Sequence, residues 1–560
     1  MTLRIRWLGR VGYHDALALQ RGLVASSADD HLLLLEHPPV ITLGVRADLG
    51  HLLVPPASVG AELIRTDRGG DVTYHGPGQL VAYPVLHLPG KRGGGMVDTA
   101  AYVGSLEQLV IDVLADLGVP DGERHPRHRG VWVGGAKVCA IGVRLTRGRS
   151  MHGFALNVAP DLSMYNHIVP CGISGGRVTS LAALGIDTTM AAVVDAVAAR
   201  AAQRWGHRGT ERQDLAWAGG VHDPSTLGRD LVSTSAGGLE ATPVRLGRRL
   251  SQAGVASGLP VAERKPPWLR APVRRGRAVQ DLAATMRSLE LTTVCEEAGC
   301  PNLSECWAEG TATFMINGAR CTRACGFCLV DTRRPEALPA GEAERVAEAT
   351  ARMGLEHAVV TAVARDDLPD GGASAFAATV VAVRRRVPGC AVEVLIPDCK
   401  GDPVALARIF ASYPDVLNHN LETVLRLQRA VRPSAGYARS LAVLARAKEA
   451  GLVTKSGMVL GMGEADDEVV GALADLAAVG VDIVTLGQYL RPTSRHLPVT
   501  RWVEPATFAA LARAGERLGI GHVEASPLTR SSYHAKGAAH ALHASSPASP
   551  AAWRCDGGTA

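Results

Sequence analysis

The sequence predicts a protein of two domains, an α+β domain followed by an α/β domain built as a partial (β/α) barrel. At 560 residues the chain is too long for a single hydrophobic core. Up to about residue 210, strand-like runs mix with helical runs, which is typical of α+β folds. From residue 358 onwards, strand-like and helix-like segments alternate regularly, which predicts a parallel sheet closed or partly closed as a barrel.

In the first domain, the spacing of apolar residues predicts where the helices and strands lie. Apolar residues at helical spacing predict helices, and alternating or continuous apolar runs between turn signals predict strands. A Gly-Gly pair at 134–135 predicts a tight turn between paired strands. The strand-like runs lie within 31–44, 68–88, 131–145 and 152–158, and the helical runs at 100–118 and 188–206.

In the second domain, a first strand is expected at 311–316, and the regular alternation follows it. Further strands are expected at 358–363, 392–396, 415–423, 454–463, 481–488 and 521–526. The helices between them are expected at 372–387, 403–411, 439–451, 466–480 and 505–519. In such barrels ligands bind at the carboxyl ends of the strands.

Changes in composition along the chain mark the limits of the two domains. The Ser-, Thr- and Gly-rich stretch 211–262 is predicted to be a flexible linker, which separates domain 1–210 from domain 263–537, and the Ala/Ser/Pro-rich tail 538–560 is predicted to be disordered. The basic segment 263–277 is interpreted as a solvated lead-in, with docking of an acidic partner as the alternative.

The overall charge and hydrophobicity exclude several classes of partner. A net charge of +5 is small for this length and does not argue for nucleic acid. No apolar run is long enough to span a membrane, and the first residues lack the apolar core of a signal peptide. We therefore expect a cytoplasmic protein, in which thiols stay reduced and favour metal over disulfides.

Six of the eleven cysteines gather between residues 295 and 328. Thiolates are soft ligands for zinc or iron–sulfur clusters. No Cys or His pair stands at zinc-finger spacing, which disfavours a zinc scaffold. Three thiolates can instead hold three irons of a [4Fe–4S] cluster and leave the fourth open to a chelating small molecule. The two triplets are C-x4-C-x5-C at Cys295, Cys300 and Cys306, and C-x3-C-x2-C at Cys321, Cys325 and Cys328.

The second triplet, on a loop after the expected first strand, resembles that of radical S-adenosylmethionine enzymes. Together with the first triplet, the region 263–537 resembles lipoyl synthase. The motifs that carry the resemblance are VCEEAGCPNLSECW, DDLPDGG, EVLIPD, NHNLET, VRPSAGYARSL, KSGMVLGMGE, GQYLRPTSRHLPV and the RSSY of residues 530–533. The upstream C-x4-C-x5-C triplet and the RSSY end argue against the alternative of a biotin-synthase-like enzyme.

This resemblance implies two [4Fe–4S] clusters and S-adenosylmethionine. Cys321, Cys325 and Cys328 would hold the cluster that binds S-adenosylmethionine, and Cys295, Cys300 and Cys306 an auxiliary cluster. Ser532 would complete the auxiliary cluster, with Ser531 as the alternative. The residues implied to bind S-adenosylmethionine are Asp370, Gly371, Gly372, Asn420 and Glu422. Sulfur would be inserted at C6 and C8 of a protein-bound octanoyl chain, with electrons from a donor such as ferredoxin or flavodoxin.

The first domain carries a second candidate site. Cys171 lies in the Gly-rich stretch NHIVPCGISGGRVTSL, although a lone cytosolic cysteine is usually a small buried hydrophobe. Lys137 lies in a strand-like segment, where an inward lysine is costly unless it has a task. A buried ammonium lowers the pKa of a nearby thiol, and the amine can serve as general acid and base. Cys139, two residues from Lys137, remains an alternative reactive thiol.

Residues 5–208 resemble lipoyl(octanoyl) transferase, which implies the α+β fold of biotin/lipoate protein ligase catalytic domains. The matching motifs are EHPPVITLG, RGGDVTYHGPGQLVAYPV, GVWVGGAKVCAIG, HGFALNV and PCGI. Cys171 would be the acyl nucleophile and Lys137 the general acid/base. The implied acyl-site residues are Arg68, Gly69, Gly70, Asp71, Val72, Thr73, Tyr74, His75, Ala140, Ile141, Gly142, Gly153, Phe154 and Ala155.

Joined in one chain, the two resemblances imply successive steps of lipoate synthesis. The implied partners are octanoyl-acyl carrier protein, the lipoyl domains of 2-oxoacid dehydrogenase complexes and the glycine cleavage H protein. Two alternatives stay open for the first domain: an ATP-using ligase, and a carrier-binding module without activity, which would leave only the second domain active.

Overall fold

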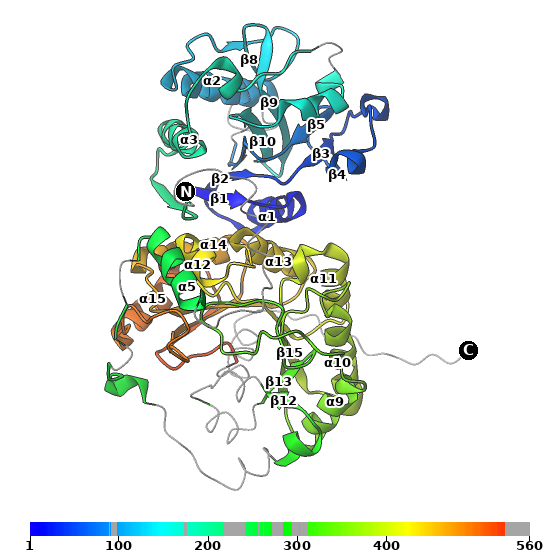
Figure 1. Cartoon of the computed structure of the whole chain (residues 1–560), viewed down its shortest axis with the longest axis vertical. Helices are drawn as coiled ribbons and strands as arrows, with labels where there is room; N and C mark the ends of the chain where they lie inside the picture. Colours follow the sequence, from blue (N-terminus) through cyan, green and yellow to red (C-terminus); the bar gives the residue numbers. More distant parts are fainter. Residues whose placement is uncertain are drawn as a thin grey trace, which may run out of the picture.

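The computed structural model describes residues 1–88, 90, 98–172, 176–217, 241–255, 258–260, 263–270, 284–293, 302 and 312–532. Its two domains are stacked, with the α+β domain and the barrel joined at α1 (Figure 1). The auxiliary-cluster candidates Cys295, Cys300 and Cys306 and the predicted tail 538–560 lie outside the described residues.

The first domain is built on a mixed sheet of eight strands in the order β11-β1-β2-β6-β10-β9-β8-β7. These strands are β1 (Leu3–Arg10), β2 (Asp30–Glu36), β6 (Gln79–Val85), β7 (Glu123–Arg124), β8 (Val131–Val133), β9 (Ala136–Thr146), β10 (Arg149–Asn157) and β11 (Thr210–Asp214). A second sheet pairs β3 (Val40–Leu43) with β4 (Glu62–Arg65) and β5 (Val72–His75). The predicted α+β class is confirmed.

Three helices flank these sheets: α1 (Tyr13–Ser26), α2 (Thr99–Asp116) and α3 (Met190–Trp205). Asp98 is the N-cap residue of α2, and Thr189 is the N-cap residue of α3. Their side chains accept hydrogen bonds from backbone amides of the first turn. The predicted turn at Gly134 and Gly135 is confirmed, and both residues have positive φ, as a two-residue hairpin loop requires. Short 3-10 helices occupy Leu49–His51, Pro56–Val59, Leu162–His167, Pro170–Gly172 and Ala182–Leu184.

The second domain is a partial barrel whose strands follow the order of the chain, from β12 to β19, so that the sheet stays open at its two ends. Its strands are β12 (Thr292–Thr293), β13 (Thr313–Ile316), β14 (His357–Ala362), β15 (Ala391–Leu395), β16 (Val416–Asn418), β17 (Thr454–Leu460), β18 (Ile483–Gln488) and β19 (His522–Ala525). All pairs from β13 to β19 are parallel, and β12 alone runs antiparallel to its neighbour. The predicted β–α alternation is confirmed.

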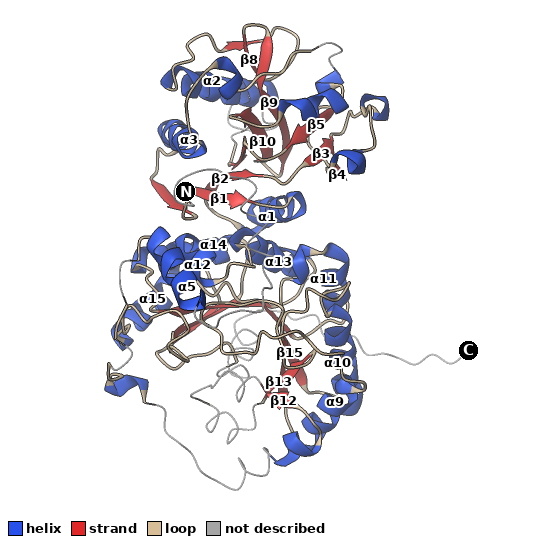
Figure 2. Cartoon of the chain, in the orientation of Figure 1, coloured by secondary structure: helices blue, strands red, loops and turns tan. Residues whose placement is uncertain are grey.

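The helices of this domain lie outside the sheet (Figure 2). They are α5 (Ala241–Gln252), α9 (Glu342–Arg352), α10 (Ala373–Arg386), α11 (Pro403–Phe410), α12 (Gln428–Val431), α13 (Tyr437–Glu449), α14 (Asp466–Ala478) and α15 (Pro505–Arg517), with 3-10 turns at Pro267–Leu269, Cys399–Gly401 and Leu425–Leu427. None of the described helices combines the length and the apolar character that crossing a bilayer requires.

The two domains share one buried interface, centred on α1 packed against α13 and α14 (Figure 1). Leu19 and Leu23 of α1 belong to the same hydrophobic cluster as Leu441 and Leu444 of α13. A side chain at Gly22 would stand 2.7 Å from the Cβ of Ala445, so glycine is needed for this close approach. The domains therefore form a packed pair, rather than two bodies joined only through a tether.

A buried ion pair crosses this interface. The Nε of Arg6 in β1 lies 2.9 Å from a carboxylate oxygen of Asp475 in α14, and both side chains are buried. The hydroxyl of Tyr437 donates a hydrogen bond of 2.9 Å to the same carboxylate. Because a buried charge is costly unless it is paired and hydrogen-bonded, these contacts satisfy the polar groups of the interface, whose main part is the apolar packing of α1 on α13.

The stretch 211–262, predicted to be a flexible linker, contains regular structure at both ends. The segment Thr210–Asp214 forms β11, which pairs in parallel with β1. The segment Ala241–Gln252 forms α5, whose Leu246 and Leu250 are buried in the shared core. The structured parts of the two domains therefore extend into the predicted linker.

Inside the barrel, Lys455 of β17 and Glu393 of β15 form a buried ion pair at 3.0 Å. Replacing Lys455 by Met leaves the carboxylate buried without its partner, and we expect it to lower the free energy of unfolding of the barrel by about 3–5 kcal/mol at pH 7. The same change in the half-exposed pair Lys448–Asp482 is the matched control, with an expected loss of about 0–1 kcal/mol.

The pH dependence of this loss follows from the pKa of Glu393. Burial alone would raise this pKa, but Lys455 and His357 lower it to about 2. The pair therefore stabilises the fold above the unfolded pKa of about 4.3, and this contribution is lost as the pH falls towards 2. Calorimetry from pH 7 to pH 3.5 should show the penalty of Lys455→Met shrinking with acidification. A penalty that stays constant, or that Lys448→Met equals, would contradict this account.

Candidate active sites

The implied acyl-site residues come together in the first domain. All of them except Val72 and Tyr74 line one pocket between β5, β9 and β10. Side chains alternate along a strand, and the two exceptions face the other side of β5. There they are buried in a cluster with Ile41, Leu43 and Tyr165. Val72 and Tyr74 therefore support the wall of the pocket from behind.

Arg68 shapes this pocket through its backbone contacts. Its buried guanidinium donates hydrogen bonds to the carbonyl oxygens of Thr42 and Asp71, both at 2.7 Å, and to that of Gly69 at 3.1 Å. The amide of Gly69 in turn donates to the carbonyl of Val143 in β9. The fork geometry of arginine thus fixes the Gly-rich loop against the neighbouring strand.

The sequence analysis missed four residues that also line the pocket: Tyr13, Val81, Tyr83 and His152. Val81 and Tyr83 lie two residues apart on β6, so alternation along this strand was an available signal. His152 has a left-handed backbone with φ of 57°, which is uncommon for a residue other than glycine. Its Nε2 bonds Asp67 at 2.7 Å, and its buried Nδ1 has no hydrogen-bond partner among the described residues.

The histidines of the pocket are neutral at physiological pH. The pKa of His75 and of His152 is lowered to about 3, mainly by burial and in part by the positive charge of Arg68. His37, behind Tyr83, has a pKa of about 4 for the same first reason. The lining is therefore largely apolar, with neutral histidines and with the guanidinium of Arg68 bound to backbone carbonyls, and this suits an aliphatic acyl chain.

Lys137 lies on β9 with only 6% of its surface exposed. Its Nζ stands 5.1 Å from the centre of the Trp132 ring, a distance typical of a cation–π contact. The backbone of Lys137 is hydrogen-bonded on both sides to the segment that follows the Cys171 loop, with its amide donating to Arg177 and its carbonyl accepting from Thr179. The lysine is thus held beside this loop.

The structure describes the backbone of Cys171, which lies in the 3-10 turn Pro170–Gly172. The amide of Val169, just before the turn, donates to the carbonyl of His51. A side chain at Gly172 would stand 2.8 Å from the carboxylate of Asp71, which itself bonds His51 at 2.6 Å. The turn therefore rests against Asp71, one of the pocket residues.

The alternative thiol, Cys139, has the surroundings of a core residue. It is fully buried in the hydrophobic cluster that includes Val110, Val113 and Leu156. Burial raises the pKa of its thiol well above the ordinary value. A thiol with a raised pKa is a poor nucleophile, so Cys139 is a small buried hydrophobe in this environment.

In the second domain, Cys321, Cys325 and Cys328 lie on the loop that follows β13, as expected. Backbone hydrogen bonds hold this loop at several points: Cys321 donates to Asp331, Gly326 donates to Val431, and the carbonyl of Cys328 bonds His496 at 2.9 Å. The three thiols are partly buried. The pKa of Cys328 is raised to about 12, mainly by burial and in part by the neighbouring thiols Cys325 and Cys321.

The other predicted radical-site residues follow neighbouring strands at the same end of the sheet. Gly372 approaches Asn317, just after β13, so closely that a Cβ would stand 2.3 Å from its side chain, and φ of 88° also favours glycine there. Asp370 caps α10 by accepting hydrogen bonds from the backbone amides of Gly372 and Ser374. Its carboxylate thus has a structural task at this position.

Asn420 and Glu422 follow β16 and bond each other at 3.0 Å. Asn420 also donates a hydrogen bond of 2.7 Å to the hydroxyl of Ser531. Glu422 lies close enough to the cysteine loop to raise the pKa of Cys325 and of Cys328. Of the two candidate serine ligands, Ser531 is thus tied to the site by Asn420, and Ser532 lies next to it.

Three thiols on one backbone-anchored loop, close enough to shift the pKa of Cys328, fit a site-differentiated [4Fe–4S] cluster. The sulfur of Cys321 accepts a hydrogen bond from the amide of Arg323 at 3.4 Å, a contact of the kind that tunes cluster sulfurs. Among the described residues, no three His, Cys, Asp or Glu side chains converge on a single-ion site.

Comparison with known proteins agrees with this division of the chain. Residues 12–202 match the family model of the lipoyl protein ligase A/B catalytic domain, and residues 315–476 match that of the radical SAM superfamily. A bipartite lipoate protein ligase from Thermoplasma acidophilum is 18% identical, with a TM-score of 0.32 over 42% of this chain and 93% of that one.

Curated relatives match the second domain. The chain is 56% identical to the lipoyl synthase of Rubrobacter xylanophilus over 273 residues, which are 48% of this chain and 85% of the relative. It is 53% identical to the lipoyl synthase of Mycolicibacterium paratuberculosis over 289 residues, 52% of this chain and 94% of the relative. The chain therefore belongs to the lipoyl synthase family, with a lipoyl protein ligase A/B catalytic domain fused ahead of its radical SAM region.

Proposed function

We propose that this chain carries out two successive steps of lipoate synthesis on a carrier protein. The first domain transfers octanoyl from acyl carrier protein to a lysine of a lipoyl domain, and the second inserts sulfur at C6 and C8. The observation that supports this most strongly is the largely apolar pocket of the first domain, which lies in the same chain as a lipoyl synthase domain.

In the first step, the thiol of Cys171 attacks the octanoyl thioester, and Lys137 takes its proton. Lys137 then gives that proton to the departing carrier thiol. In the return step, the neutral amine of the lipoyl-domain lysine attacks the enzyme thioester and gives a proton to Lys137. Lys137 passes this proton to the leaving sulfur, so that Cys171 is released as a thiol. The largely apolar pocket holds the acyl chain, and Lys137 is itself buried beside the Cys171 loop.

In the second step, the residues of the chain bind and orient the reactants. Cys321, Cys325 and Cys328 would hold one cluster, and Cys295, Cys300, Cys306 and Ser532 the other. Bound there, the clusters and S-adenosylmethionine supply hydrogen abstraction and sulfur. Gly371 and Gly372 would bring backbone against S-adenosylmethionine, with Asn420 and Glu422 at the neighbouring strand end.

An anaerobic reaction tests the proposal. The full chain is mixed with octanoyl-acyl carrier protein, apo lipoyl domain, S-adenosylmethionine and reductant, and the carrier is weighed by mass spectrometry. We expect the lipoyl mass, and about eight irons per reconstituted chain. An unmodified carrier, with lipoyl product formed only from pre-octanoylated carrier, would indicate that the first domain is a binding module. Octanoyl attachment that needs free octanoate and ATP would indicate a ligase.

A further inference from the structure

One loop of the barrel touches both the first domain and the cysteine loop. This loop, Asp398–Gly401, follows β15 and is called the junction loop below. Its residues Cys399, Lys400 and Gly401 have φ of 45°, 55° and 77° in succession. Left-handed backbone at two adjacent residues other than glycine is strained, and it persists only where the surroundings hold it.

On one side, the junction loop meets helix α1 of the first domain. The carboxylate of Asp15 is buried and lies 3.0 Å from Nε of Arg439 and 3.2 Å from Nη1 of Arg446, both in α13. Arg446 also donates to the carbonyl of Gly401. Gly401 is so close that an added Cβ would stand 2.8 Å from Asp15, which is therefore in contact with the junction loop.

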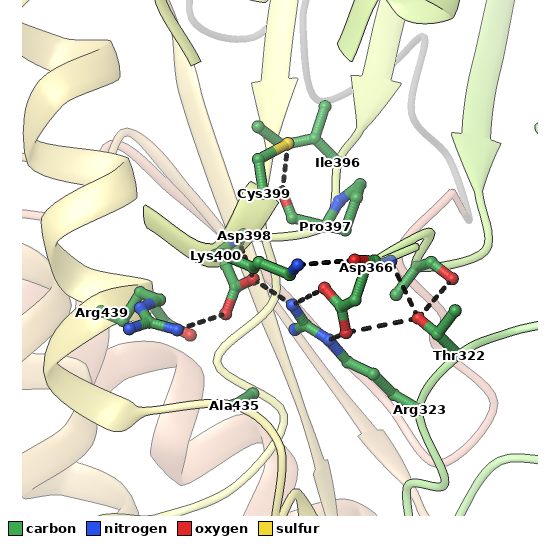
Figure 3. Close-up of polar contacts among 12 residues, drawn as sticks. Thr322, Arg323, Asp366, Ile396, Pro397, Asp398, Cys399, Lys400, Ala435 and Arg439 are labelled. Carbon is green, nitrogen blue, oxygen red and sulfur yellow. Dashed lines mark hydrogen bonds and ion pairs between the residues drawn. The ribbon is translucent and has the colours of Figure 1, made fainter. Parts of the chain in front are cut away.

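On the other side, the junction loop holds the cysteine loop through Arg323 (Figure 3). The guanidinium of Arg323 donates to Asp398 at 2.6 Å and, through two nitrogens, to Asp366 at 2.7 Å. Arg323 lies between Cys321 and Cys325 in the sequence, and its amide donates to the sulfur of Cys321. Asp398 thus acts on the backbone that carries the thiols.

The junction loop also supports the second predicted element of the radical site. The Cα of Cys399 would be 3.3 Å from a Cβ at Gly371, so the two backbones are in contact. The Nζ of Lys400 donates a hydrogen bond of 2.5 Å to the carbonyl of Asp366 (Figure 3). One loop therefore orients both the thiol loop and the Asp370–Gly372 turn.

Arg439 is shared between two carboxylates. It lies 3.0 Å from Asp15 but 3.9 Å from Oδ2 of Asp398. This Oδ2 is buried and accepts no hydrogen bond among the described residues. Asp15 therefore draws Arg439 away from Asp398 and leaves Asp398 to pair with Arg323.

We propose that Asp15, in the transferase-like domain, is a positioning residue for the radical site of the other domain. Its charge holds Arg439, and so keeps the Asp398–Arg323 pair that orients the Cys321–Cys328 loop. Without this charge, Arg439 moves onto Oδ2 of Asp398. Its positive charge then shares the carboxylate with Arg323, which is bound to Oδ1, weakens the Asp398–Arg323 pair and loosens the loop. Docking of the first domain thereby supports the second site, an inference that rests on the proposed function for its biological meaning but not for its test.

Hydrogen–deuterium exchange of the full, anaerobically reconstituted chain tests this without any turnover. We expect Asp15→Asn to speed exchange of the peptides covering 318–332 and 364–372 by about three- to tenfold, as coupled neighbouring residues commonly show. Asp475→Asn is the matched control, because it neutralises the other buried carboxylate of the same interface. It should leave these peptides unchanged.

A second variant tests whether Asp15 acts on the cysteine loop through Arg439. In an Arg439→Met background, no arginine can move onto Asp398, so Asp15→Asn should no longer speed exchange of the cysteine loop. Arg439→Met alone should leave the cysteine loop protected. This second expectation can be tested even if Asp15→Asn fails to fold. Equal effects of Asp15→Asn and Asp475→Asn, no effect of Asp15→Asn, or loosening by Arg439→Met alone would each overturn the proposal. Sulfur insertion into pre-octanoylated carrier by the unaltered chain is measured separately, so that a failure of the proposed function is seen on its own.

Discussion

A Cys328→Ser variant of the full chain is expected to lose sulfur insertion by more than about 100-fold while it still attaches octanoyl to the carrier. Even outer partners of a metal ligand cost about 10- to 100-fold when removed, so loss of a direct thiolate ligand exceeds this range. The loop itself should remain in place, because Cys321, Gly326 and Cys328 are held through their backbone atoms. The measurement is the carrier mass together with iron content.

The matched control is Cys390→Ser. Cys390 is buried in the barrel core, and its sulfur contacts the carbonyl of Ala391, which a serine hydroxyl can also reach. We expect the control to retain sulfur insertion and the full iron content. Loss of sulfur insertion in both variants would point to a fold defect, and retention in Cys328→Ser would remove this triplet from the reaction.

Much of the fold followed from short-range pattern in the sequence. The β–α units of the barrel and the hairpin at Gly134–Gly135 were visible because period, turn residues and length agreed with one another. Strand β11 was missed because Thr210–Asp214 is polar throughout, and it becomes a strand only by pairing with β1. Helix α5 was missed because its buried residues Leu246 and Leu250 give too sparse an apolar stripe.

The candidate sites were predictable to the extent that motifs carry them. Backbone-defined features such as the Arg68–Gly70 loop and the cysteine loop lie where the motifs suggested. Tyr13 reaches the acyl pocket from the start of α1, and no local pattern marks it. The contact of Asp15 with Arg439 joins residues more than 400 positions apart, and such a long-range charge pair leaves no trace in a single sequence.

A Lys137→Met variant is expected to lower octanoyl transfer by about 10²- to 10⁴-fold, the usual contribution of a positioned general acid–base group. Met keeps the length and the packing of the side chain against Trp132, so the hairpin β8–β9 should remain folded. Sulfur insertion into pre-octanoylated carrier should be unchanged. The comparison is the initial rate of octanoyl attachment, with the lipoyl product measured in parallel.

Lys137→Arg separates proton transfer from charge alone. Arginine keeps the positive charge beside the Cys171 loop but does not release its proton in proteins, so it should be nearly as inactive as Met if Lys137 is the acid/base. Recovery of transfer by Arg would instead assign Lys137 an electrostatic role. Trapping the enzyme with octanoyl-acyl carrier protein and mapping the modified peptide completes the test, because label on Cys139 rather than Cys171 would contradict the buried, raised-pKa environment that the core gives Cys139.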